Sequence, residues 1–202
     1  MKNIITIQHT QSVHHTNGMI GSWADWDLTE LGMEEARQIG KKLSAGLEGK
    51  PFTMYTSDLI RAKRTAEIAA GFFDIEPIIS AELRERNLGE ASGKSKEWFK
   101  ENEIADSDWI DGKPFIGAES LREAWNRLKL FHDKIMETND ENIIIVSHGE
   151  SLSLFYSIWL GWDIEMLSKY QLLGKSGGVS FLKEDANGKR IIGLLNDLSY
   201  KG

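Results

Sequence analysis

The chain has 202 residues, with 24 lysines and arginines, 31 acidic residues and a net charge of −7. Because it contains no cysteine, disulfide bonds, thiolate zinc sites, iron–sulfur clusters and cysteine nucleophiles are excluded. The excess of acidic over basic residues argues against a nucleic-acid partner, because nucleic-acid-binding proteins usually present a basic surface. Its apolar stretches are too short for a signal peptide or a membrane span, so the sequence predicts a cytoplasmic protein without a membrane partner.

Apolar runs and helical periodicity alternate along the chain, and this alternation predicts an α/β sheet with helices on both faces. Thr29 is expected to cap the first helix, and Ser57 or Asp58 the second. Asn187 and Gly188 predict the turn of a C-terminal hairpin. In chain order, the expected elements are a strand at 4–7, a helix at 30–47, a strand at 52–56, a helix ending near 73, a helix at 119–138, a strand at 143–146, a helix at 149–160 and a hairpin of 178–181 with 190–195.

We expect a single domain over residues 1–202, built as a three-layer α/β sandwich around a mostly parallel sheet. The stretch 89–117 is the least regular and is expected to form a lid or an insertion. Two strands rich in β-branched residues are followed by polar pairs that contain His9 and His148. Ligands of open α/β sheets bind beyond the carboxyl ends of the strands. The pattern therefore predicts a site built around these two histidines.

Four short motifs follow one another between residues 8 and 149. They are Gln8-His9-Thr10-Gln11-Ser12 with Asn17, Gly21 and 27–32 after it; Ser57-Asp58-Leu59-Ile60-Arg61-Ala62; Leu83-Arg84-Glu85-Arg86 with Gly89 and Gly93; and Val146-Ser147-His148-Gly149. Together they resemble the histidine phosphatase superfamily, which includes the cofactor-dependent phosphoglycerate mutases. The resemblance implies a phosphoglycerate mutase-like fold, a small phosphorylated substrate, and no metal or other cofactor. The oligomeric state stays open, with a homodimer as one option.

The resemblance assigns roles to the matched residues. His9 would be the nucleophile, since a neutral imidazole attacks phosphorus at neutral pH without a thiolate. Arg61 would bind phosphoryl oxygens with its guanidinium fork, and His148 would donate a hydrogen bond to the same group. Gly149 opens a helix whose N-terminus favours anions. Asn17 matches a residue that bonds the phosphate or orients the nucleophile.

Glu85 is the expected general acid. An alkoxide leaving group needs a proton as the P–O bond breaks, and the resulting carboxylate can then activate water. Glu82 and Glu90 are alternatives, and the spacing of Leu83, Glu85 and Gly89 favours Glu85.

The residues on both sides of His9 depart from the family's usual Arg-His-Gly motif. Gln8 offers a neutral amide instead of a permanent cation, and a lost charge-assisted hydrogen bond costs on the order of 1.5–3 kcal/mol. Thr10 replaces the glycine, and it either adds a hydroxyl donor or narrows the pocket. The candidates to restore the positive charge are His14, His15, Lys94 and Lys96.

Several other side chains are candidates for the pocket wall. Trp23 and Trp26 either stack on a planar substrate or pack their loop onto the body. A metal site at His14 and His15 is not expected, because adjacent side chains diverge and no third ligand is obvious. The candidates for lining the pocket are Thr10, His15, Trp23 and Lys96.

Two classes of function follow from these residues. The first is a phosphomonoester hydrolase of the histidine acid phosphatase type, with a phosphohistidine intermediate on His9. The alternative is a weakly active or inactive relative that binds a phosphorylated ligand or a protein partner. Retention of the family's catalytic residues favours the first class. Mutase activity is less favoured, because residues 94–117 contain lysines but no arginine, whereas the mutases carry extra arginines there.

Overall fold

The computed structural model describes residues 1–47, 49–104 and 108–202. Within these ranges, six strands form one sheet in the order β3-β2-β4-β1-β5-β6. The first four are parallel, and the last two form an antiparallel hairpin beside β1. The strands are β1 (Asn3–Gln8), β2 (Thr53–Thr56), β3 (Ile78–Ile79), β4 (Asn142–Ser147), β5 (Val179–Glu184) and β6 (Arg190–Asp197).

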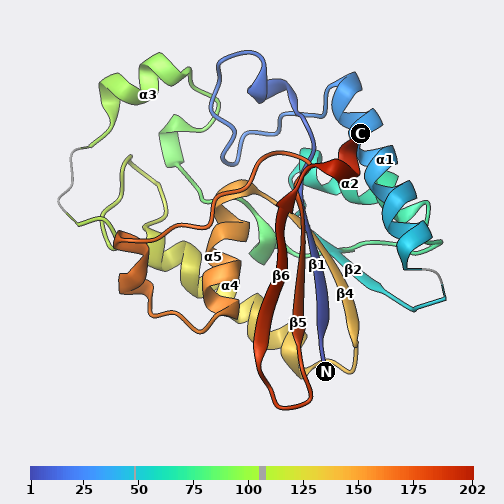
Figure 1. Cartoon of the computed structure of the whole chain (residues 1–202). Coiled ribbons are helices and arrows are strands. Elements are labelled where there is room, and N and C mark those ends of the chain that lie inside the picture. The colour runs from blue at the N-terminus through green and yellow to red at the C-terminus, as the bar shows by residue number, and fades with distance from the viewer. Residues whose placement is uncertain (48, 105–107) are drawn as a thin grey trace.

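Helices cover both faces of this sheet. Figure 1 shows α1 and α2 on one side and α4 and α5 on the other, and α3 lies near the end opposite the N-terminus. The predicted three-layer α/β fold with a mostly parallel sheet is confirmed. The helices are α1 (Glu30–Gly46), α2 (Ile60–Ala70), α3 (Lys96–Asn102), α4 (Leu121–Glu137) and α5 (Gly149–Trp159).

Successive residues of the central strands enter two different cores. Ile4 of β1 packs with Leu128 of α4 and Phe155 of α5, whereas Ile5 packs with Ile39 of α1 and Ala66 of α2. Side chains alternate across a strand, so a strand covered by helices on both faces needs apolar residues at every position. This requirement explains the continuous β-branched runs in the sequence.

The start of α2 differs from the prediction. Neither Ser57 nor Asp58 caps the helix, which begins at Ile60. The Ile60 N–H instead donates to the carboxylate of Asp25, 2.8 Å away. Ser57 and Asp58 are used elsewhere, because Ser57 contacts His148 and Asp58 pairs with Arg84. The helix also ends at Ala70, before the expected position near residue 73.

The parallel strands end at one edge of the sheet. Gln8 of β1 is in register with Ser147 of β4, and Thr56 of β2 with Val146. The residues that follow these strands are therefore neighbours, and the His9 N–H donates to the Ser147 carbonyl at 2.9 Å. This edge is where the fold places its candidate site.

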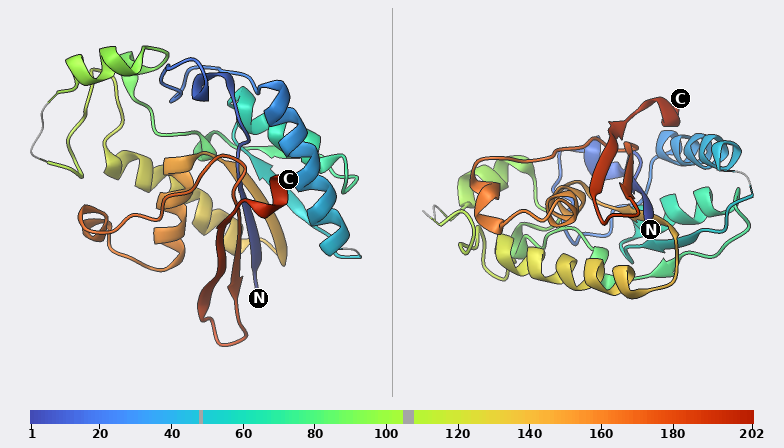
Figure 2. Two further views of the ribbon diagram at one scale, coloured as in Figure 1. Left: turned by 45° about the horizontal axis from the view of Figure 1, so that its top comes forward. Right: turned by 60° about the horizontal axis from the view of Figure 1, so that its bottom comes forward.

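The stretch expected to be a lid or insertion packs against the loop after β1. Met19 and Ser95 form a β-bridge, and Figure 2 shows α3 beside this loop. At the base of the stretch, Gly89 has a φ of +55°, and a Cβ there would lie 2.1 Å from the Ile116 carbonyl oxygen. Its residues 105–107 lie outside the described ranges. Among the helices that are described, none is long and apolar enough to cross a membrane.

Candidate active site

His9 is held as a neutral ring with its lone pair on Nε2. The residue is buried directly after β1, and its Nδ1 bonds the Thr10 carbonyl oxygen at 2.9 Å. A carbonyl oxygen only accepts, so Nδ1 carries the proton. Arg61 Nε donates to His9 Nε2 at 3.3 Å. Burial, followed by the charge of Arg61, lowers the pKa of His9 well below its usual range, which leaves a nucleophilic Nε2 at neutral pH.

Arg61 is fixed by the loop after β1. Its Nη1 donates to the Ala24 carbonyl at 2.9 Å and its Nη2 to the Ser22 carbonyl at 2.7 Å. Burial lowers its pKa to about 10, so the side chain remains a cation at neutral pH. Ser22 has a φ of 45°, and its hydroxyl accepts the Leu88 N–H. The guanidinium is therefore set in place through two segments distant in sequence.

His148 presents an unpaired ring nitrogen to the same site. Its Nε2 lies 2.9 Å from Ser57 Oγ, and Ser57 Oγ accepts the Leu59 N–H. When the Ser57 hydroxyl donates to Nε2, the proton of the neutral ring lies on Nδ1. This buried Nδ1 has no hydrogen-bond partner in the described part of the chain. The ring lies 5.1 Å from that of His9, centroid to centroid, and burial followed by Arg61 lowers its pKa.

Glu85 lies at the N-terminus of α5. Its carboxylate accepts the backbone N–H groups of Glu150 and Ser151, at 3.3 and 3.1 Å, and the Ser151 hydroxyl at 3.1 Å. The structure places the alternatives differently, since Glu82 bonds Ser80 and Glu90 is exposed. Of these three acids, Glu85 is therefore the one whose side chain contacts the start of α5, the helix that follows His148.

Glu150 is a second acid that sequence reasoning missed. It follows His148-Gly149, and its side chain pairs with Arg86 at 3.4 Å. Burial, followed by the charge of Glu85, raises the pKa of its carboxyl. The one sequence feature that points to Glu150 as a site residue is its position directly after the fourth motif.

Gln8 is half-buried beside the start of α5. A Cβ on Gly149 would lie 3.2 Å from Gln8 Nε2, and one on Gly174 would lie 2.8 Å from Gln8 Oε1. The Gln8 amide is therefore enclosed between two glycines. It presents a neutral amide directly before His9.

Thr10 turns away from the histidines. Its hydroxyl donates to the Gly32 carbonyl of α1 at 2.7 Å, and its backbone N–H donates to the Thr65 hydroxyl of α2 at 3.2 Å. The side chain is buried between these helices. The hydroxyl is thus used in packing and is not directed into the pocket.

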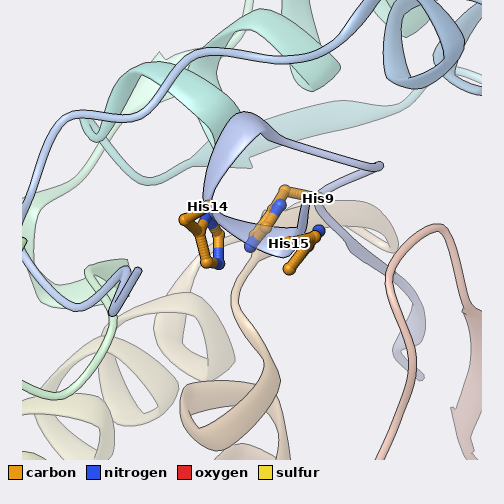
Figure 3. A group of neighbouring side chains, drawn as sticks. All are labelled: His9, His14 and His15. Carbon is orange, nitrogen blue, oxygen red and sulfur yellow. The ribbon is translucent and has the colours of Figure 1, made fainter. Parts of the chain in front are cut away.

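His14 and His15 gather with His9 at the mouth of the site (Figure 3). The rings of His9 and His15 are stacked at 5.3 Å with 6° between their planes, and those of His14 and His15 are 4.1 Å apart. The expectation that adjacent histidines diverge without a third partner is wrong. Residues Val13–His15 form a 3-10 turn that folds both rings toward His9. Gly21 makes room, because a Cβ there would lie 2.9 Å from His14 Nε2.

This cluster suits an anion better than a metal. One nitrogen from each ring lies within 4.8 Å of the other two, a spacing that resembles a metal site. However, the Ser12 N–H donates to His15 Nδ1, so a neutral His15 carries its proton on Nε2. Arg61 also faces the His9 lone pair. Burial, followed by the charges of Arg61 and Lys96, lowers the pKa of His15, and these two cations favour an anion at the cluster over a metal cation.

The other candidates lie around this cluster. Asn17 is exposed, and its Oδ1 accepts the Met19 N–H at 3.0 Å, which closes its turn. Trp23 Nε1 donates to the Glu85 carbonyl at 2.7 Å, and the Arg84 guanidinium lies 4.6 Å from the Trp23 ring centroid. These contacts favour the packing role of Trp23. Lys96 is exposed at the start of α3. Burial is the main cause that lowers the pKa of both His14 and His15, and the charge of Lys96 adds to it.

A cavity of about 470 Å³ lies between α3 and the start of α5. It is next to Glu85, because Arg86 and Glu150 form part of its wall. Its charged residues are of both signs, and aromatic rings lie among them. The lining includes Arg86, Phe99, Lys100, Glu103, Trp109 and Glu150.

Comparisons with known proteins identify the family. The profile of the "Histidine phosphatase superfamily (branch 1)" matches residues 4–197. A 2,3-bisphosphoglycerate-dependent phosphoglycerate mutase from Rhizobium meliloti is 32% identical over 182 residues, which cover 84% of this chain and 82% of the relative.

Two solved structures share the fold. An alpha-ribazole phosphatase from Shigella flexneri has a TM-score of 0.81 at 21% identity, covering 97% of this chain and 96% of that one. A phosphoserine phosphatase variant from Entamoeba histolytica, in complex with phosphoserine, has a TM-score of 0.76 at 22% identity, covering 99% of both chains. At such identities the likeness concerns the fold.

Proposed function

Because the chain belongs to the histidine phosphatase superfamily, we propose that it hydrolyses a small phosphomonoester through a phosphohistidine on His9. The observation that carries this proposal is the fixed tautomer of His9. Its Nδ1–H is bonded to the Thr10 carbonyl, so the Nε2 lone pair faces Arg61. A neutral ring in this state attacks phosphorus without prior loss of a proton, once the phosphoryl oxygens take the Arg61 N–H from Nε2.

The first step transfers the phosphoryl group to His9. Nε2 attacks phosphorus, the P–O bond to the leaving group breaks, and Glu85 gives the leaving oxygen its proton. Arg61 and the Nδ1–H of His148 bind the phosphoryl oxygens as negative charge moves onto the leaving oxygen. The products are the alcohol and N-phosphorylated His9.

The second step returns the enzyme to its starting state. The Glu85 carboxylate takes a proton from water, the water oxygen attacks phosphorus, and the P–N bond breaks. Inorganic phosphate leaves, His9 is again neutral and Glu85 is again protonated. The two steps are balanced without a metal or an external acid.

Phosphoglycerate mutase activity is the second candidate, because a relative of 32% identity carries that name. A mutase must bind a second anionic group of its substrate close to the phosphohistidine. The cavity beside Glu85 has Arg86 and Lys100 in its wall, but also Glu103 and Glu150. These mixed charges favour hydrolysis over mutase activity.

The test is to trap the phosphoenzyme with a panel of phosphomonoesters. We expect an acid-labile, base-stable phosphoryl group on the wild-type protein, release of phosphate, and loss of both in His9→Ala. Glycerate phosphates are included, and rapid interconversion of the 3- and 2-phosphates would favour the mutase. If wild type and His9→Ala show neither a phosphohistidine nor turnover, the chain is a binding protein and the proposal is wrong.

A further inference from the structure

We propose that His15 is a phosphoryl-binding residue, which donates its Nε2–H to the group carried on His9. This inference rests on the proposed function of the site.

His15 is within reach of a phosphoryl group on His9. Their rings are parallel, with 6° between the planes and 5.3 Å between the centroids. One nitrogen of each ring lies within 4.8 Å of the other. A phosphoryl group on His9 Nε2 extends in the plane of that ring with oxygens on either side of the plane, so one oxygen faces the side on which His15 is stacked and can accept an N–H···O bond from it. His15 is exposed, so its ring can adjust toward the group.

Ser12 sets the direction in which His15 can donate. The Ser12 backbone N–H donates to His15 Nδ1 at 3.2 Å, so this nitrogen holds the lone pair. The proton of the neutral ring is then on Nε2. The same tautomer opposes a metal at Nε2, whereas an anion accepts the Nε2–H. The protein thus presents a neutral donor at the mouth of the site.

The charges around His15 favour an anion. Arg61 of α2, Lys96 of α3 and Lys201 near the C-terminus all act on the ring, and Glu35 of α1 acts in the opposite sense. Glu35 is itself bonded to Lys201 at 2.8 Å and to the Gln11 N–H at 2.9 Å. Partial burial together with these cations lowers the pKa of His15, and the ring stays neutral at neutral pH.

His15→Phe and His15→Gln separate the donor from the ring. Phenylalanine keeps a flat ring against His9 but has no N–H, whereas glutamine has an N–H at a similar distance from the backbone but no ring. Sulfate, a stable dianion, is the probe, and calorimetry measures its Kd. We expect His15→Phe to raise the Kd about tenfold, and His15→Gln to stay within about threefold of wild type. The reverse order would show that His15 acts by stacking, and equal affinities would also overturn the proposal.

Nitrogen NMR of the wild-type protein gives a second measurement that needs no variant. We expect the His15 ring to show a protonated Nε2 in the free protein, and we expect this proton to move downfield when sulfate saturates the site. A proton on Nδ1, or an Nε2–H that does not respond to sulfate, would contradict the proposal.

The outcomes separate this inference from the proposed function. If sulfate binding depends on His15 but no phosphohistidine forms, the function fails and the anion site remains. If the phosphohistidine forms and His15→Phe binds sulfate as wild type does, the inference fails and the function remains.

Discussion

The protons on two imidazole rings, those of His9 and His15, follow from the hydrogen bonds of their second nitrogens. His9 gives its Nδ1–H to Thr10, and His15 accepts at Nδ1 from Ser12. His148 Nε2 bonds the Ser57 hydroxyl, which leaves its buried Nδ1 unpaired within the described residues. The site therefore combines a lone pair on His9, an N–H donor on His15 and the unpaired Nδ1 of His148, while Arg61 supplies the fixed positive charge. Each ring has a different role because its backbone or hydroxyl partner differs.

Gln8→Arg tests the charge that the site lacks. A guanidinium between Gly149 and Gly174 would add a charge-assisted hydrogen bond to the phosphoryl group, and we expect kcat/KM to rise about tenfold. Steady-state kinetics with one phosphomonoester measures this change. Gln8→Lys is the matched variant, which adds charge without the planar fork. A fall in kcat/KM in both folded variants would mean that the pocket is built around the Gln8 amide.

Glu85→Gln tests the general acid through the leaving group. An alkyl phosphate needs a proton on its leaving oxygen, so we expect its turnover to fall about 10²–10⁴-fold. A nitrophenyl phosphate has a good leaving group, so its first step should persist while hydrolysis of the phosphohistidine slows. Rapid mixing should then show a burst of nitrophenolate. Equal losses for both substrates, with no burst, would show that Glu85 is not the acid.

The four residues that the family motifs identify most clearly lie together, because three of their segments end at one edge of the sheet. His9, Arg61, Glu85 and His148 are linked by direct contacts or through the start of α5. Asn17 was placed in the site by its motif, but its side chain closes a turn. The 3-10 turn instead directs His15 at His9, and sequence spacing does not reveal which way a side chain points from such a turn.

At the scale of elements, the first turn of α1 supports the loop that carries His9. Gly32 allows this approach, since a Cβ there would lie 1.9 Å from the Gln11 carbonyl oxygen. The Thr10 hydroxyl also donates to the Gly32 carbonyl. The nucleophile is thus positioned by a helix that contributes no side chain to the chemistry.

Gly32→Ala should therefore affect both stability and activity. The Gln11 carbonyl must move to admit the methyl group, and we expect a loss of about 2 kcal/mol or more in the free energy of unfolding, with lower kcat. Gly46→Ala is the matched control at the other end of α1, where a Cβ meets no atom within 4 Å. It should leave stability unchanged or raise it by up to about 1 kcal/mol. Chemical denaturation measures both, and equal effects would contradict the close approach.

Elements with a strong local signal were predictable, and those that depend on distant partners were not. Thr29 caps α1 as expected, and its hydroxyl accepts the Gly32 N–H. The start of α2 is decided by Asp25, which lies 35 residues earlier. The two-residue strand β3 and the helix α3 also went unrecognised. Ile78 of β3 pairs with β2, and Ser95, directly before α3, pairs with Met19. These pairings form only once other segments of the chain are in place.

For the whole molecule, the alternation of strands and helices was sufficient to predict the layers. The strand order was not predictable from the same pattern, because β4 enters between β1 and β2 although it is late in the chain. This insertion brings His148 beside His9. The site is therefore a product of the sheet order, and it depends on the stability of the complete fold.

The pH dependence of that stability should be set by the histidines. All five, namely His9, His14, His15, His132 and His148, have pKa values below the ordinary 6.5, with burial as the largest cause. Above that value, both the folded and the unfolded chain hold neutral rings. As the pH falls through it, the unfolded chain binds protons that the folded chain does not. The free energy of unfolding should therefore decrease from about pH 7 to about pH 5, by up to about 1.4 kcal/mol per pH unit for each buried histidine.

His132→Leu isolates one of these contributions away from the site. His132 is buried against Phe155 and Trp159, and its Nε2 has no hydrogen-bond partner among the residues described. Leucine removes the titrating group and keeps an apolar side chain, so the slope of stability against pH should become shallower. Urea unfolding at several pH values between about 5 and 8 measures both slopes. A wild-type stability that rises on acidification, or an unchanged slope in the variant, would show that burial does not hold these rings neutral.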